Sequence, residues 1–108
     1  MKTPAYTLEM RLSTHAGNTI CETVRSVLGP TATVRLFGSR ANDSSKGGDI
    51  DLLVESSSVI EQPAVVAARI GALLQMALGD QRIDVLIAAP NVQDQAIHHI
   101  ARANGIAL

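Results

Sequence analysis

Three aspartates and one glycine–serine turn are the residues of this sequence whose types and spacing could perform chemistry. Asp49 and Asp51 stand two positions apart in an apolar run, and side chains at such positions of a strand share a face, roughly 7 Å apart. Carboxylates held side by side repel one another unless a cation lies between them. Asp49 and Asp51 are therefore candidate ligands of Mg²⁺, which combines carboxylates with substrate phosphates. Asp84, in a later apolar run, would complete the metal's shell and accept the proton of an attacking hydroxyl.

The turn Gly38-Ser39 precedes the aspartates and has the features of a phosphate-binding turn. Its backbone N–H groups and the Ser39 hydroxyl can bind phosphate oxygens, and glycine lets the phosphate approach closely. Arg40 can neutralise another phosphate oxygen. Together with the aspartates, the turn predicts a nucleotide site in which two Mg²⁺ ions, roughly 3.5–4 Å apart, hold the attacking and leaving oxygens of a phosphoryl transfer.

The elements that must position these residues follow from the hydrophobic periodicity. Strands are predicted over 32–37, 49–55 and 82–88, and helices over 14–28, from Pro63 to Gly79, and from a cap at Asn91 to Gly105. The segment 42–48 has no apolar side chain and is predicted to be a surface loop. The order predicts one domain over residues 1–108 with an α/β (α+β) fold, a small mixed sheet covered on one face by helices. The other face, which carries the aspartates, would be left open for chemistry.

Composition limits the classes of function. The net charge is −1 and no block of Lys and Arg is present, so direct binding of nucleic acid is not expected. Tyr6 and Phe37 are the only aromatic residues, which argues against stacking on bases. The single cysteine, Cys21, excludes a multi-cysteine zinc site. Because no signal peptide and no membrane-spanning apolar stretch is found, we expect a cytoplasmic protein without membrane contact.

These motifs together resemble the nucleotidyltransferase superfamily that includes DNA polymerase beta. The residues that carry the resemblance are Gly38-Ser39, Asp49-x-Asp51 and Asp84. The Gly-Ser-Arg-Ala run at 38–41 is similar to the start of the motif in the minimal nucleotidyltransferase (MNT) branch. The resemblance covers about residues 30–90, a closing helix and Gly105. The loop departs from the common pattern, with Asn42-Asp43 after its basic start and Gly47-Gly48 before the first aspartate.

The resemblance implies a function and a partner. MNT proteins are typically encoded beside a HEPN-domain protein, and this chain looks like an antitoxin that transfers AMP from ATP to a tyrosine of a HEPN ribonuclease toxin, which silences the toxin. Mg²⁺ is the implied cofactor, with two ions expected, and ATP the implied substrate. Carried over by position, the nucleotide-binding residues are Gly38, Ser39 and Arg40, and the metal-binding and catalytic residues are Asp49, Asp51 and Asp84.

Other interpretations of the chain remain open. It could be a non-catalytic antitoxin that neutralises its partner by forming a complex, or a separate subunit of a larger nucleotidyltransferase. The preferred base and the number of AMP groups transferred are left open by the sequence. A homo-oligomer and a hetero-oligomer are both compatible with it.

Several residues have a simpler structural interpretation. The aspartates could form a solvated strand face, although aspartate is unfavourable in strands. Arg35 and Arg82 are expected to be solvated side chains that flank strands. His98 and His99 are expected to be surface residues, because neighbouring residues of a helix point in different directions and cannot share a metal.

Overall fold

The computed structural model describes residues 12–38, 49–79 and 81–108. Its helices are α1 (Thr14–Leu28), α2 (Pro63–Leu78) and α3 (Ala96–Asn104). Its strands are β1 (Thr33–Phe37), β2 (Ile50–Glu55), β3 (Ile83–Ala88) and β4 (Ile106–Ala107). All six predicted elements are present, and β4 is added by the apolar tail. The predicted loop 42–48 lies outside the described residues. Within the described ranges, no helix has the length and apolar character needed to span a membrane.

The strands form one mixed sheet in the order β3-β2-β1-β4. β1 is antiparallel to both β2 and β4, whereas β2 and β3 run parallel. A parallel pair needs a crossover connection, and α2 supplies it. This topology confirms the predicted α+β class and leaves β3 at one edge of the sheet.

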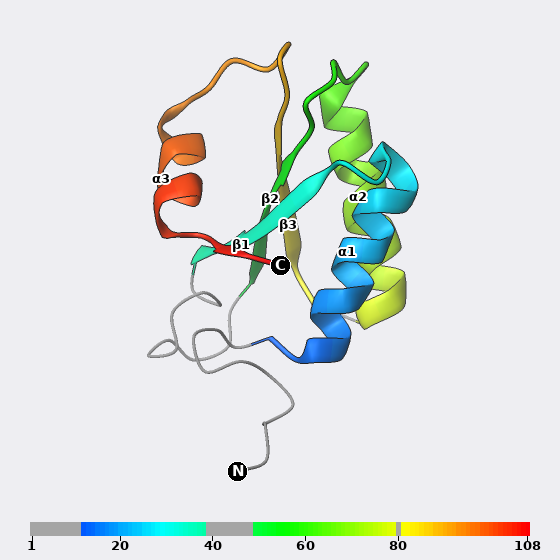
Figure 1. The fold of residues 1–108 in the computed structure, drawn as a ribbon. Coiled ribbons are helices and arrows are strands. Elements are labelled where there is room, and N and C mark those ends of the chain that lie inside the picture. Colours follow the sequence, from blue (N-terminus) through cyan, green and yellow to red (C-terminus); the bar gives the residue numbers. More distant parts are fainter. Residues whose placement is uncertain (1–11, 39–48, 80) are drawn as a thin grey trace.

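One face of the sheet packs against α1 and α2, as Figure 1 shows. Alternate strand residues are buried on this face, which is the period-two pattern of a strand with one side in a core. The fully buried side chains of this core are Leu36, Ile50, Leu52 and Val54 from the strands, and Ile20, Val24, Ile70 and Leu74 from the helices. Each contributes roughly 1.5–3 kcal/mol relative to an exposed position, so aliphatic packing fixes the sheet.

α3 lies on the opposite face of the sheet (Figure 1). Ala101 of α3 packs there against Phe37, Leu53 and Ala88, which form a second, smaller core. We expected the helices on one face, and two of the three lie there. The face with the aspartates is therefore open only beyond the part that α3 covers.

His98 anchors the beginning of α3 to the sheet. Its Nε2 lies 2.9 Å from the carbonyl oxygen of Ile87, and its Nδ1 accepts a hydrogen bond from the Gln95 N–H at 3.0 Å. The prediction of a surface position for His98 is wrong, because backbone partners at both ring nitrogens offset the cost of its burial. Ile97 and Ile100 of the same helix are 46% and 55% exposed.

Asn91 has a role other than the predicted helix cap. Its side-chain amide donates to the carbonyl oxygen of Ile60 at 2.8 Å, and its side-chain oxygen accepts from the Ile60 N–H at 3.1 Å. The helix begins later, with Gln95 as the N-cap residue. Asparagine commonly satisfies backbone groups in this way, and here a contact distant in sequence competes with local capping.

Val54→Asp is expected to unfold the domain, whereas Val65→Asp is expected to leave it folded. Val54 is fully buried and Val65 is 60% exposed in the first turn of α2. A buried unpaired carboxylate costs several kcal/mol, which is a large part of the stability of a small domain. Circular dichroism and urea unfolding of both variants test this, and a cooperatively folded Val54→Asp protein would contradict the assigned core.

Candidate functional site

The register of β2 and β3 brings Asp51 and Asp84 side by side. Asp51 is the direct partner of Asp84 in this parallel pair. Neighbouring strands lie about 4.8 Å apart, and direct partners point to the same face of the sheet. On its other side Asp51 is paired with Phe37 of β1. A row of Phe37, Asp51 and Asp84 thus crosses the sheet, and Phe37 at its β1 end belongs to the part that α3 covers.

Arg82 joins Asp49 and Asp84 through its guanidinium group. The Arg82 Nε lies 3.6 Å from Oδ2 of Asp49 and 3.5 Å from Oδ2 of Asp84. The Arg82 side chain is 73% exposed, so these ion pairs are weak and can be broken at small cost. The expectation that Arg82 is a merely solvated flanking residue misses this contact. Its position two residues before Asp84 was the signal, because it puts both side chains on one face.

Partial burial and the neighbouring carboxylates raise the pKa of Asp51 above its ordinary range. The largest cause is the loss of solvent around its partly buried carboxyl group, followed by the charges of Asp84 and Asp49. A hydrogen bond with Asp84 acts in the same direction, and the positive charge of Arg82 opposes it. A cation added beside Asp51 would therefore stabilise its ionised form.

Gly38 packs directly against Asp51. Its φ is +75°, in the left-handed region that glycine adopts without steric cost. A Cβ at this position would overlap the carboxylate of Asp51 and would lie 3.1 Å from its Cγ. The glycine thus allows the end of β1 to approach the acids. Ser39 and Arg40, the other two predicted nucleotide-binding residues, lie outside the described residues.

The residues of this face that could hold a divalent metal such as Mg²⁺ are its three carboxylates. Asp49 directly before β2, Asp51 in β2 and Asp84 in β3 have one positive neighbour in common, Arg82. The side chains of Asp49 and Asp84 are 45% and 52% exposed. In the part of the chain that is described, no three His, Cys, Asp or Glu side chains already have metal-ligand geometry. Arg82 lies between Asp49 and Asp84, so a metal bound by these acids would replace the positive charge of Arg82 as their partner.

An ion-pair network holds α3 at the other end of the same face. Arg102 donates to both carboxylate oxygens of Asp94, at 2.7 and 3.2 Å, and to Oε2 of Glu55 at 3.2 Å. The Nε of Arg35 lies 3.9 Å from Oε1 of Glu55. The hydrogen bond from Arg102 lowers the pKa of Asp94. The network joins the last turn of α3 to the end of β2 and so holds the helix on this face of the sheet.

The fold is similar to that of chains in two solved toxin–antitoxin complexes. One is the MntA–HpeT complex, a mutant with two Asp-to-Glu substitutions two positions apart; the identity is 17%, the TM-score is 0.66, and the match covers 84% of this chain and 70% of that one. The other is a complex of a tri-AMPylated Shewanella oneidensis HEPN toxin with an MNT antitoxin; the identity is 20%, the TM-score is 0.61, and the match covers 86% of this chain and 68% of that one. No protein-family model matches the chain, and no curated protein matches its sequence.

Asp51→Asn is expected to leave the metal-free protein at least as stable as the wild type at neutral pH. The raised pKa means that ionised Asp51 destabilises the folded state, and the wild type recovers this stability as the pH falls through the raised value toward the ordinary one. The difference between the two proteins should therefore shrink near pH 4, about the ordinary pKa of aspartate. Urea unfolding at both pH values measures it. A variant clearly less stable than the wild type at neutral pH would argue against the crowding of carboxylates.

Gly38→Ala is expected to destabilise the protein through a clash with Asp51 in addition to backbone strain. Gly38 has a φ of +75°, and an added Cβ would overlap the carboxylate of Asp51. The strain of alanine at a positive φ, about 1–2 kcal/mol, should remain whichever residue stands at position 51. The contribution of the clash should disappear when Asp51 is also changed to alanine, which a double-mutant cycle measures. A coupling energy of zero would mean that Gly38 and Asp51 do not touch.

Proposed function

We propose that this chain is a metal-dependent nucleotidyltransferase that acts as an antitoxin, transferring AMP from ATP to a tyrosine of a HEPN ribonuclease toxin. The observation that carries the proposal is the pairing of Asp51 with Asp84, with Asp49 on the same face and Gly38 packed against Asp51. The shared fold with two MNT toxin–antitoxin complexes supports it. One of those complexes contains a toxin that already carries AMP groups.

The acids would divide the chemistry among them. Asp49 and Asp51 would hold Mg²⁺, with Asp84 completing the ligand set. When bound, the metal would neutralise the phosphate charges that develop during transfer. The glycine turn at Gly38 would admit the phosphates close to the backbone. Arg82, freed from Asp49 and Asp84, would become available to an incoming anion.

The proposed transfer conserves all atoms. The tyrosine oxygen forms a new bond to the α-phosphorus of ATP, and the bond from that phosphorus to the bridging oxygen breaks. Diphosphate leaves with the bonding pair. Asp84, which is half exposed at the edge of the sheet, would accept the proton of the tyrosine hydroxyl.

A second candidate function is neutralisation of the partner by binding alone. It is favoured by the large apolar side chains that remain exposed on the two sides of the sheet, Val65 and Met76 on α2 and Ile97 and Ile100 on α3. Their exposures range from 46% to 82%. Such surfaces are common at protein interfaces. A binding antitoxin needs these surfaces and does not need the acids.

Incubation with labelled ATP, Mg²⁺ and the HEPN-domain protein encoded beside this chain distinguishes the two functions. The transferase is expected to place label on the partner, and the label should disappear when the partner's acceptor tyrosine is changed to phenylalanine. Asp51→Asn and Asp84→Asn should each reduce labelling by at least about 100-fold, the loss typical of removing one transition-state contact. Binding to the partner should persist in both variants.

Two results would decide against catalysis. Neutralisation of the ribonuclease by wild type and Asp51→Asn alike, with no label on the partner, would identify a binding antitoxin. Full labelling by both aspartate variants would contradict the assigned acids. Glu22→Gln is the matched control, because Glu22 is an exposed acid of α1 and lies outside the proposed site.

A further inference from the structure

The outer edge of β3 offers unpaired backbone groups beside the acids. The amides of Ile50, in β2, and of Ser56, directly after it, donate to the carbonyls of Arg82 and Ala88, so the even-numbered residues of β3 face β2. The odd-numbered residues between them point their N–H and C=O groups away from the sheet. Val85 is the central one, and within the described residues no strand lies beyond β3.

One end of this free edge is closed. The Nε2 of His98, in α3, lies 2.9 Å from the outward-pointing carbonyl oxygen of Ile87, at hydrogen-bond distance. The free part of the edge therefore extends from Val85 toward Ile83, which is the direction of the acid cluster. A chain that paired with β3 would be guided toward Asp84.

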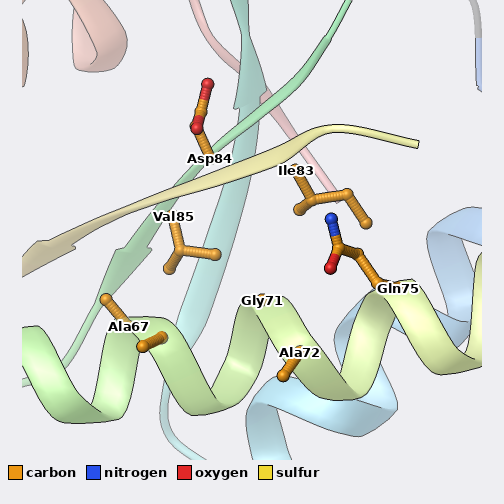
Figure 2. A pocket seen from close by; sticks show the side chains of 8 residues that line it. Ala67, Gly71, Ala72, Gln75, Ile83, Asp84 and Val85 are labelled. Carbon is orange, nitrogen blue, oxygen red and sulfur yellow. The ribbon is translucent and has the colours of Figure 1, made fainter. Parts of the chain in front are cut away.

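A groove runs along this edge between β3 and α2. Ile83 and Val85 point down to α2 and Asp84 points to the other side of the strand, as Figure 2 shows. The helix offers small side chains below, with Ala67, Gly71 and Ala72 among the lining residues. The cavity here is about 310 Å³. A second cavity of about 330 Å³ shares Ala67 and Val85 with it and continues toward His98.

The outer surface of α2, which borders the groove, is apolar. The helix has one charged residue, Arg69, in its whole length. Val65 and Met76 lie at helical spacing on the side away from the core and are 60% and 82% exposed. Large apolar side chains exposed at neighbouring positions are common at protein interfaces, so this surface and the groove beside it are suited to a partner chain.

We propose that this groove binds an extended segment of the protein acceptor, which adds to β3 as a further strand. The segment would pair with the backbone of Val85, and its side chains would point alternately into the groove and to the face of the acids. A hydroxyl-bearing residue paired beside Asp84 would then continue the row formed by Phe37, Asp51 and Asp84. This inference rests on the proposed transfer to a protein. It adds the site at which the acceptor is recognised.

The occupant follows from the position of the groove. Asp84 belongs both to the lining of the groove and to the acid cluster, so whatever fills the groove reaches the reacting groups. An edge strand with a floor of mostly small side chains beside it suits an extended peptide, whose backbone can pair with the strand. A second copy of this chain that paired through its own β3 would fill the same surface without delivering a hydroxyl, because Ile83–Ala88 contains none.

Ala72→Arg tests the groove, with Ala77→Arg as the matched control. Both alanines are exposed on α2, but only Ala72 lines the groove. Arginine is a good helix former, so both variants should unfold like the wild type. With the HEPN-domain protein encoded beside this chain as the probe, Ala72→Arg should weaken binding at least about tenfold, equivalent to about 1.4 kcal/mol, and raise the KM of labelling. Ala77→Arg should match the wild type in both measurements.

Amide hydrogen exchange tests the strand pairing itself. In the free protein the Val85 amide, which points outward, should exchange faster than the Leu86 amide, which is bonded to β2. Addition of the HEPN-domain protein should slow exchange at Val85 to a rate near that of Leu86. An unchanged Val85 amide in a saturated complex would overturn the pairing.

The outcomes separate this inference from the proposed function. Labelling and binding by Ala72→Arg at wild-type levels would overturn the groove and leave the transferase intact. Loss of binding by Ala72→Arg, in a wild type that binds without labelling, would support the groove and overturn the transferase. If Ala72→Arg only converts a dimer of this chain to a monomer, with acceptor binding unchanged, the groove is a self-interface and the inference is overturned.

Discussion

The parallel pairing of β2 with β3 is the constraint on which the rest of the structure depends. It places two like charges, Asp51 and Asp84, next to each other on one face. At a separation of roughly 5 Å their repulsion is about 1 kcal/mol in water and about 3 kcal/mol at an effective dielectric constant of 20. A small domain keeps such a pair only because its aliphatic core, on the opposite face of the same strands, outweighs the repulsion.

The surroundings of the acids reduce this repulsion without removing it. Arg82 supplies one positive charge between Asp49 and Asp84, from an exposed side chain that is easily displaced. Gly38 leaves the carboxylate of Asp51 in place where any larger residue would displace it. The site therefore combines two properties. Its excess negative charge would attract a divalent cation, and the backbone at Gly38 can be approached closely by a phosphate group.

The two faces of the sheet have different functions. On one face α1 and α2 bury the core, and on the other α3 covers part of the surface and is held there by His98 and Arg102. Asp51 and Asp84 lie beside this covered part. Because β3 is both an edge strand and a carrier of Asp84, the same element can present the site and, in our proposal, receive the acceptor.

Local patterns in the sequence were enough to predict most of the fold. The boundaries of α1 follow from a cap at Ser13 and a stop at Gly29, and alternation along the strands separates the buried Ile50, Leu52 and Val54 from the aspartates. These features depend on neighbours within a few residues, so periodicity reveals them. The glycine turn and the spacing of the first two aspartates are also local features that the sequence shows directly.

Contacts between distant segments were not predictable in this way. That α3 lies on the face of the acids, that His98 is buried, and that Asn91 bonds Ile60 in place of capping a helix all depend on which segments meet in space. The position of Arg82 between two carboxylates is of the same kind. The sequence by itself determined which residues could carry the chemistry and on which face of each strand they lie. Only the tertiary structure decided which of them are neighbours, because strand order and register are set by the packing of the whole chain.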